Sequence, residues 1–229
     1  MPAATPESLF PRKRPTQARA QERVRLILDA AREIAKCEPI ESVTTTAIAE
    51  RAGLPVGSLY QYFPNRLAIL AEVGRGVLRE IDDATVARLR ASASVPWESA
   101  VDAVIDGTLA SHQAHDDTKA LFRTLVATPE LSSLADESNR RLAGALSRHP
   151  ALAHSGLPRA EVQQIARVVI QAGDAVQHLV LGAGTETEAA AMATEMKKLL
   201  RAYLALYLEA SSSEPSLAGD SPEPTEVRT

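Results

Sequence analysis

Apolar residues recur along most of this chain at the spacing of an α-helix. Between residues 16 and 37 they are three or four positions apart and so lie on one helical face, as Val24, Ile27, Leu28, Ala31, Ile34 and Ala35. Pro39 ends this segment, because proline lacks the backbone N–H that a helix requires. The same spacing predicts a long helix over residues 66–92, with one face made of Leu70, Val73, Val77, Ile81 and Ala84.

Between these segments the pattern predicts two short helices, over residues 44–52 and 56–63. Thr44 is a suitable N-cap, Gly53 ends the first helix, and Pro64 ends the second. Two short helices joined by a tight turn that contains glycine have the layout of the helix-turn-helix motif. Six apolar residues would hold the two helices together: Ile48, Ala49, Ala52, Leu54, Leu59 and Phe63.

Five further helices are expected in the C-terminal half, where proline, glycine or paired aspartates interrupt the apolar pattern. Their expected positions are near residues 97–115, 117–127, 130–148, 159–182 and 186–209. The segment 159–182 is apolar on nearly two sides, and a helix that is apolar all round is typically buried. Either the last two helices only form core, or they form a dimer interface through Val176, Leu179, Leu199, Leu200 and Tyr203.

Composition favours an all-α fold and distinguishes the two ends of the chain. The 229 residues are 45% hydrophobic but only 3% aromatic, which favours packed helices over sheets. We expect a flexible basic arm over residues 1–15 and a disordered acidic tail over 211–229. Between them we expect a three-helix head with the helix-turn-helix over 16–65 and a larger helical body over 66–210.

Charge differs between the two parts of the chain. Residues 1–80 hold 12 Lys and Arg against 9 Asp and Glu, whereas residues 81–229 hold 13 against 20. A mildly basic head on an acidic body suits a protein whose N-terminal part contacts phosphates, although a difference of this size is weak support by itself.

The second short helix has a polar outward face. At about 100° per residue its apolar residues point inward, which leaves Gly57 and Gln61 pointing outward beside Ser58 and Tyr60. Gln61 can hydrogen-bond adenine at two atoms, and Ser58 can bond either base type. Gly57 removes the side chain where the helix would lie closest to DNA. The hydroxyls of Tyr60 and Tyr62 can donate to phosphates.

Residues from about 20 to 75 resemble the DNA-binding part of the tetracycline-repressor (TetR) family of bacterial transcription regulators. The matching positions are Thr44-Thr45, Ile48-Ala49, Ala52-Gly53 and the run Val56-Gly57-Ser58-Leu59-Tyr60-Gln61-Tyr62-Phe63-Pro64-Asn65-Arg66. Three positions depart from the usual pattern. Val56 stands where the family usually has a basic or polar residue, Tyr62 where it has histidine, and Arg66 where it has lysine.

The resemblance implies which residues contact operator DNA. The start of the first short helix would approach a phosphate, the second would lie in the major groove, and the start of the long helix would bind another phosphate. The implied contact residues are Thr44, Thr45, Thr46, Val56, Gly57, Ser58, Tyr60, Gln61, Tyr62 and Arg66. Arg12 to Arg14, with Arg19, would reach the DNA backbone or the minor groove.

The resemblance also implies a homodimer on a near-palindromic operator, joined through the last two helices and released by a small-molecule effector bound in the body. Residues that could contact this unknown effector are Trp97, His112, Phe122, Arg123, Gln171, Asp174 and His178. Asp174 and His178 lie one helical turn apart and face either the effector pocket or the dimer seam. In the pocket, Asp174 would favour a cationic or hydroxyl-bearing ligand, whereas Arg123 would favour an acidic one.

Other kinds of chemistry have little support in the sequence. No apolar stretch is long enough to span a membrane or resembles a signal peptide, so we expect a soluble, cytoplasmic protein. His112 and His115 have metal-compatible spacing without a completing ligand, and Cys37 has no partner for an internal disulfide. We expect no metal, no cofactor and no enzyme activity. The alternative to a DNA-binding regulator is a helical adaptor that has lost DNA binding, and the small polar face around Gly57 favours the regulator.

Overall fold

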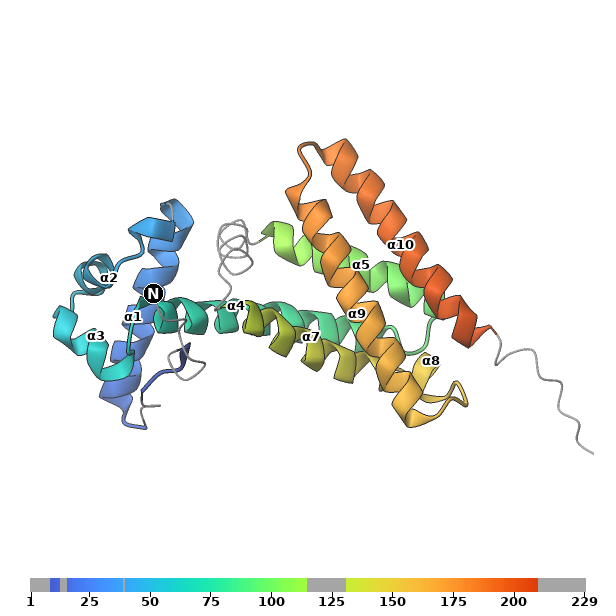
Figure 1. The fold of residues 1–229 in the computed structure, drawn as a ribbon, viewed down its shortest axis with the longest axis horizontal. Helices are drawn as coiled ribbons and strands as arrows, with labels where there is room; N and C mark the ends of the chain where they lie inside the picture. The colour runs from blue at the N-terminus through green and yellow to red at the C-terminus, as the bar shows by residue number, and fades with distance from the viewer. Residues whose placement is uncertain (1–8, 13–15, 39, 115–130, 210–229) are drawn as a thin grey trace, which may run out of the picture.

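The computed structural model describes residues 9–12, 16–38, 40–114 and 131–209, and this part of the chain is all-α, as predicted. Its elongated shape has a small head at one end and a larger body at the other (Figure 1). The helical segments are α1 (Ala18–Cys37), η2 (Ile40–Ser42), α2 (Thr45–Ala52), α3 (Val56–Tyr62), α4 (Arg66–Ala91), α5 (Trp97–Ala114), α7 (Ser132–Leu146), α8 (Pro150–Ala153), α9 (Arg159–Gly182) and α10 (Glu186–Leu208).

Each helix expected within the described residues is present, and its ends lie within two residues of the expected positions. The helix expected over 117–127 lies outside the described residues, as does the tail over 211–229. The short helix α8 was not expected, because we treated Pro150 as an interruption. In the structure Pro150 begins α8, since the fixed φ of proline suits the first position of a helix.

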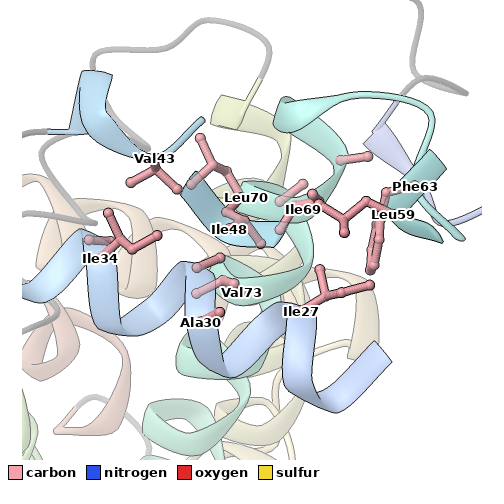
Figure 2. Close-up of a cluster of buried hydrophobic side chains, with 14 of the residues drawn as sticks. Ile27, Ala30, Ile34, Val43, Ile48, Leu59, Phe63, Ile69, Leu70 and Val73 are labelled. Atoms are coloured by element: carbon pink, nitrogen blue, oxygen red, sulfur yellow. The ribbon is translucent and has the colours of Figure 1, made fainter. Parts of the chain in front are cut away.

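The head core lies between α1, α2, α3 and the first half of α4. Ile27 of α1, Ile48 of α2, Leu59 of α3 and Ile69 of α4 are at most 1% exposed. Figure 2 shows these side chains directed into the same space between the helices. Each buried aliphatic side chain of this size contributes about 1.5–3 kcal/mol, so α4 stabilises the helix-turn-helix as directly as α1 does.

Local capping explains where the short helices begin and end. The Thr44 side chain accepts a hydrogen bond from the backbone N–H of Ala47 at 3.1 Å, which confirms it as the N-cap of α2. Gly53 ends α2 with a φ of 66°, a left-handed conformation that glycine adopts without steric cost. Asn65 accepts from the N–H of Ala68 at 2.8 Å and so starts α4 directly after α3.

Part of the segment that we expected to be a flexible arm is packed on the head. Leu9 is 5% exposed and belongs to the head core, and the guanidinium of Arg75 donates to its carbonyl oxygen at 3.3 Å. The same guanidinium lies 4.3 Å from the ring centroid of Phe10, and the N–H of Arg12 donates to the carbonyl of Tyr62 at 2.7 Å. Residues 9–12 of the expected arm thus contact the head, because an apolar side chain in this basic segment is buried.

The body packs the second half of α4 against α5, α7, α9 and α10 around its own core. Leu89, Ile105, Leu146, Ile165 and Leu204 represent these five helices in that core. In Figure 1, α4 and α7 run together from the head into the body, and α9 crosses them before pairing with α10. None of the described helices is long and apolar enough to span a bilayer.

A buried carboxylate joins α4 to α7. Asp82 is 3% exposed and accepts hydrogen bonds from the Ser138 hydroxyl at 2.7 Å and from Arg141 at 3.5 Å. Arg141 also binds the exposed neighbour Asp83. Burial raises the pKa of the Asp82 carboxyl, and the hydrogen bond from Ser138 opposes this rise without cancelling it.

We expect Asp82→Asn to change how stability depends on pH. Because the folded-state pKa of Asp82 is raised, the folded chain keeps this proton over a pH range in which the unfolded chain has lost it. The contribution of Asp82 to the free energy of unfolding therefore falls as the pH rises through that range. Chemical denaturation between roughly pH 4 and pH 7 should show the wild type losing stability relative to Asp82→Asn as the pH rises.

Asp83→Asn is the matched control, because Asp83 binds the same arginine but its side chain is 69% exposed. This control should follow the wild type. A difference between Asp82→Asn and the wild type that stays constant over the whole pH range would contradict the prediction.

Candidate functional site

The outward face of α3 has the orientation that its sequence predicts. Leu59 is 1% exposed in the head core, whereas Tyr60 is 45% exposed and Gly57 and Gln61 are also exposed. Val56 is exposed at the start of the helix, although it is apolar. The helix that carries these exposed, uncharged residues lies at the end of the molecule farthest from the body (Figure 1).

The start of α2 lies beside this surface. Thr44 and Thr46 are exposed, and the hydroxyl of Thr45 lies 3.3 Å from the hydroxyl of Tyr60 on α3. Ser58 is partly buried. The start of α2 and the exposed face of α3 are therefore adjacent at this contact.

Tyr62 lies differently from the other expected contact residues. Its side chain is 8% exposed and belongs to the head core. The neighbouring backbone is also occupied, since the carbonyl of Tyr62 accepts from Arg12. On a helix that ends at this residue, position 62 follows the buried Leu59 by three residues and so lies on the same face.

Gly57 has a residue type that the fold itself does not require. Its φ is not positive, and a Cβ atom built on it meets no heavy atom within 4 Å. Alanine would normally be favoured over glycine in a helix by up to about 1 kcal/mol. Packing within the chain therefore leaves room for a side chain at position 57.

Arg66 binds the chain itself. Its guanidinium donates to the backbone carbonyl of Ile40, which ties the start of α4 to η2. The arginine is partly buried, and its Nε atom is enclosed without a hydrogen-bond partner. Arg66 thus holds the head together at the position where we expected a phosphate contact.

The body contains a mainly apolar cavity of about 150 Å³ between α4, α5, α7, α9 and α10. Apolar side chains such as Ile105, Val169 and Leu204 form most of its wall. The polar side chains in its lining are Asp82, Thr85, Thr108, His112, Ser138, Asn139, His149, Asp174 and Gln177. A concave, largely apolar site with a few polar groups is the usual form of a small-molecule site.

Three of the seven expected effector residues line this cavity, namely Trp97, His112 and Asp174. Gln171 and His178 lie on α9 outside its lining, and Phe122 and Arg123 lie outside the described residues. From the sequence we named Gln171, Asp174 and His178 on α9 but missed Gln177, which is three residues from Asp174 and one from His178.

Asp174 contacts two side chains, Asn139 of α7 and His178 of α9. The side chain of Asn139 on α7 donates to it at 3.0 Å, and the imidazole of His178 lies 3.6 Å away. Asn139 and Asp174 both line the cavity, while the His178 side chain is 38% exposed. Asp174 therefore belongs to the cavity wall within a single chain.

An apolar surface extends over α9 and α10. Leu179 is 58% exposed and Leu199 is 48% exposed, as expected for dimer contacts, and Val176 and Tyr203 are partly buried. The expectation for Leu200 was wrong, because its side chain is 5% exposed and packs inside the body beside Gly173. Adjacent residues of a helix differ by about 100° in direction, so Leu199 and Leu200 point to different sides. Val168 and Leu206 extend the exposed apolar surface.

Comparison with known proteins relates both parts of the chain to one family. Residues 27–73 match the family model for bacterial regulatory proteins of the tetR family, and residues 96–204 match the tetracyclin repressor-like C-terminal domain. The chain is 30% identical over 146 residues to the HTH-type transcriptional regulator BetI of Escherichia coli O17:K52:H18, a match that covers 62% of this chain and 73% of BetI.

The chain belongs to the TetR family. A second BetI, from Cronobacter sakazakii, is 30% identical over 129 residues, which cover 55% of this chain and 64% of that protein. The crystal structure of a TetR-family transcriptional regulator from Streptomyces coelicolor matches with a TM-score of 0.55 and 25% identity, over 81% of this chain and 99% of that one.

Membership of the TetR family makes this chain a DNA-binding, ligand-responsive transcriptional regulator rather than an enzyme. The α2–α3 pair lies in the region matched by the tetR-family model, and most of the body lies in the region matched by the tetracyclin repressor-like C-terminal domain. Within the described residues, no group of three or more His, Cys, Asp or Glu side chains is placed to hold a metal ion.

We expect Arg66→Ala to lower the free energy of unfolding by about 1.5–3 kcal/mol, because a hydrogen bond from a charged donor in a partly buried site is lost. Urea denaturation measures this change. Arg51→Ala is the control, since Arg51 binds Glu33 at 3.3 Å in an exposed pair worth less than about 1 kcal/mol. Equal stability of Arg66→Ala and the wild type would show that the contact with Ile40 has no structural role.

Proposed function

We propose that this TetR-family chain is a repressor that binds a near-palindromic operator as a homodimer and is released by a small molecule bound in the body cavity. The observation that carries the DNA-binding part is the α3 surface, where Gly57 lacks a side chain that the fold has room for. A helix that enters the major groove needs such a close approach at the points nearest the bases.

Base recognition is assigned to the exposed polar groups of α3. Gln61 is the candidate for a bidentate contact to adenine, and the small Ser58 can bond either base type. Val56 offers an apolar surface of the kind that contacts a thymine methyl. Thr44 and Thr46 are the candidates for phosphate contacts at the start of α2.

Gly57→Ala should weaken operator binding at least tenfold while leaving the head as stable as before, or slightly more so. The added methyl group meets open space within the chain but would collide with DNA in the groove. Gel shift with the intergenic DNA upstream of the gene measures the first effect, and thermal denaturation measures the second.

Gly76→Ala is the matched control, because this glycine is also helical and open but lies on α4, away from the α3 surface. It should bind operator normally and gain up to about 1 kcal/mol of stability. If Gly57→Ala binds operator as tightly as Gly76→Ala, α3 does not enter the groove at Gly57.

Dimerisation is assigned to the apolar surface of α9 and α10. Leu199, Tyr203 and Leu206 are spaced four and three residues apart on α10, so they lie on one face. Val168 and Leu179 on α9 are eleven residues apart, about three helical turns, and also share a face. Exposed leucines at these spacings are typical of a surface that a second copy covers.

Leu199→Glu should convert the dimer to a folded monomer, because an isolated carboxylate would be buried in the interface. The loss of about 3 kcal/mol or more corresponds to a dimer Kd raised at least about a hundredfold. Sedimentation or light scattering at several protein concentrations measures this Kd.

Thr194→Glu adds the same charge to an exposed position on another side of α10 and is the control. It should dimerise like the wild type. A Leu199→Glu protein that remains a dimer at low micromolar concentration would place the interface elsewhere.

The proposed release mechanism is a population shift between two conformers of the same dimer. A ligand weakens operator binding only to the extent that it binds the DNA-free conformer more tightly than the DNA-bound one. Helix α4 is suited to connect the two sites, because Ile81, Asp82 and Thr85 line the cavity while Ile69 and Leu70 lie in the head core.

A further inference from the structure

The cavity wall carries two pairs of polar side chains that contact each other. The hydroxyls of Thr85 on α4 and Thr108 on α5 lie 3.2 Å apart. One turn further along α5, His112 has its Nε2 atom 2.8 Å from the side-chain nitrogen of Gln177 on α9. These four residues all line the cavity, and His112 is only 4% exposed. Hydrogen-bonding capacity in an otherwise apolar wall is what fixes the orientation of a small ligand.

Charged groups in the wall disfavour an anionic ligand. Among the described lining residues the acidic ones are Asp82 and Asp174, and none is Lys or Arg. Among these described residues, a carboxylate or phosphate that enters the apolar space would be desolvated and would meet no lysine or arginine to balance its charge.

The same two acidic residues are already occupied by partners from the chain, which disfavours a cationic ligand. Asp82 accepts from Ser138 and Arg141, so partners from α7 already occupy its oxygen atoms. Asp174 accepts from Asn139 and lies beside His178. A cation would have to replace these contacts in order to gain its own.

The contact between His112 and Gln177 favours a hydroxyl group. If the Gln177 amide donates to the imidazole, its carbonyl oxygen remains as an acceptor toward the cavity. If the amide has the opposite orientation and its oxygen accepts from the imidazole, its NH₂ group remains as a donor. A hydroxyl both donates and accepts and therefore suits either arrangement.

We infer that the effector is a small neutral molecule, an apolar ring or short chain with one hydroxyl group that hydrogen-bonds to Gln177. This inference rests on the proposed role of the cavity as the effector site. The volume of about 150 Å³ sets the size, because an apolar cavity of this volume takes up a molecule such as benzene. The wall therefore favours an uncharged ligand that makes one hydrogen bond over a ligand that would need an ion pair.

A series of four compounds with the same ring tests the charge and hydrogen bonding of the ligand. They are benzyl alcohol, toluene, benzoate and benzylammonium. Trp97 is the single tryptophan of the chain and lines the cavity, so its fluorescence reports occupancy in the full-length protein. Benzyl alcohol should bind at least tenfold more tightly than either ion. It should bind about 2- to 12-fold more tightly than toluene, which corresponds to one net hydrogen bond of 0.5–1.5 kcal/mol.

Two substitutions of Gln177 test the assigned contact. Gln177→Leu should abolish the preference for benzyl alcohol over toluene while toluene still binds. Gln177→Glu keeps the shape of the side chain and adds a negative charge, so the affinity for benzylammonium should rise at least tenfold. Gln163→Leu is the control, because Gln163 is exposed on the same helix and is not part of the cavity wall. This control should keep the wild-type order of the four compounds.

Tighter binding of benzoate or benzylammonium than of benzyl alcohol to the wild type would overturn the inference, as would an unchanged alcohol preference in Gln177→Leu. Binding of none of the four would also overturn it. Operator binding measured by gel shift without any compound keeps these outcomes separate from the proposed function. A protein that binds operator and ignores the whole series is still a DNA-binding regulator, but its cavity does not select a neutral hydroxyl compound.

Discussion

The structure depends on the packing of one face of α4 against two different cores. Ile69, Leu70, Val73, Val77 and Ile81 are all buried in the core of the head, and the later residue Leu89 is buried in the core of the body. From Leu70 to Ile81, spacings of three and four residues keep the buried positions on one side of the helix. The distance from Ile69 to Leu89 along a helix axis is about 30 Å, since each residue advances by 1.5 Å. A single rigid element thus reaches from the DNA-binding surface to the cavity.

Helix α7 restricts how α4 can move. Leu131 and Leu134 contribute to the head core from the start of α7, and Ser138 and Arg141 bind Asp82 one and two turns later. A buried carboxylate that loses its hydrogen-bond partners is strongly unfavourable, so α4 and α7 shift together or not at all. Because Asp82 and Ser138 also line the cavity, a molecule bound there contacts both helices of this connection.

The sequence was sufficient for the parts of the fold that local physics determines. Apolar spacing located the helices, and Thr44, Gly53 and Pro64 located the limits of the helix-turn-helix, because capping and turn formation depend on neighbouring residues alone. The resemblance to the TetR family then supplied what α2 and α3 do. The outward orientation of Gly57 and Gln61 followed from the helical period.

The sequence-based predictions were wrong where tertiary packing determines whether a side chain is buried or exposed, or which distant residue it contacts. Leu200 and Leu199 are equally apolar, and only the position of α9 buries the first and exposes the second. Leu9 lies in a basic, proline-rich segment whose composition favours disorder, yet its side chain fills a gap in the head core. Gln177 was missed because α5 is distant in sequence, and the significance of Gln177 comes from its contact with His112. Contacts between distant segments leave no periodic signal in a single sequence.

The size of the cavity constrains how a ligand bound in it can change the conformational equilibrium of this TetR-family regulator. Moving a two-state equilibrium from 1:99 to 99:1 requires about 5.5 kcal/mol of differential binding free energy. A ligand of about eight non-hydrogen atoms gains at most about 12 kcal/mol in total, at a ceiling of 1.5 kcal/mol per atom. One net hydrogen bond supplies only about 1 kcal/mol of the difference. If the effector proposed above shifts the equilibrium this far, nearly half of its maximal binding free energy depends on the conformer, and the apolar wall is then closed when the protein is on DNA. Since Ile81, Thr85 and Leu89 form part of that wall, a small displacement of α4 toward α5 and α9 would close it and would move the head by the same rigid helix.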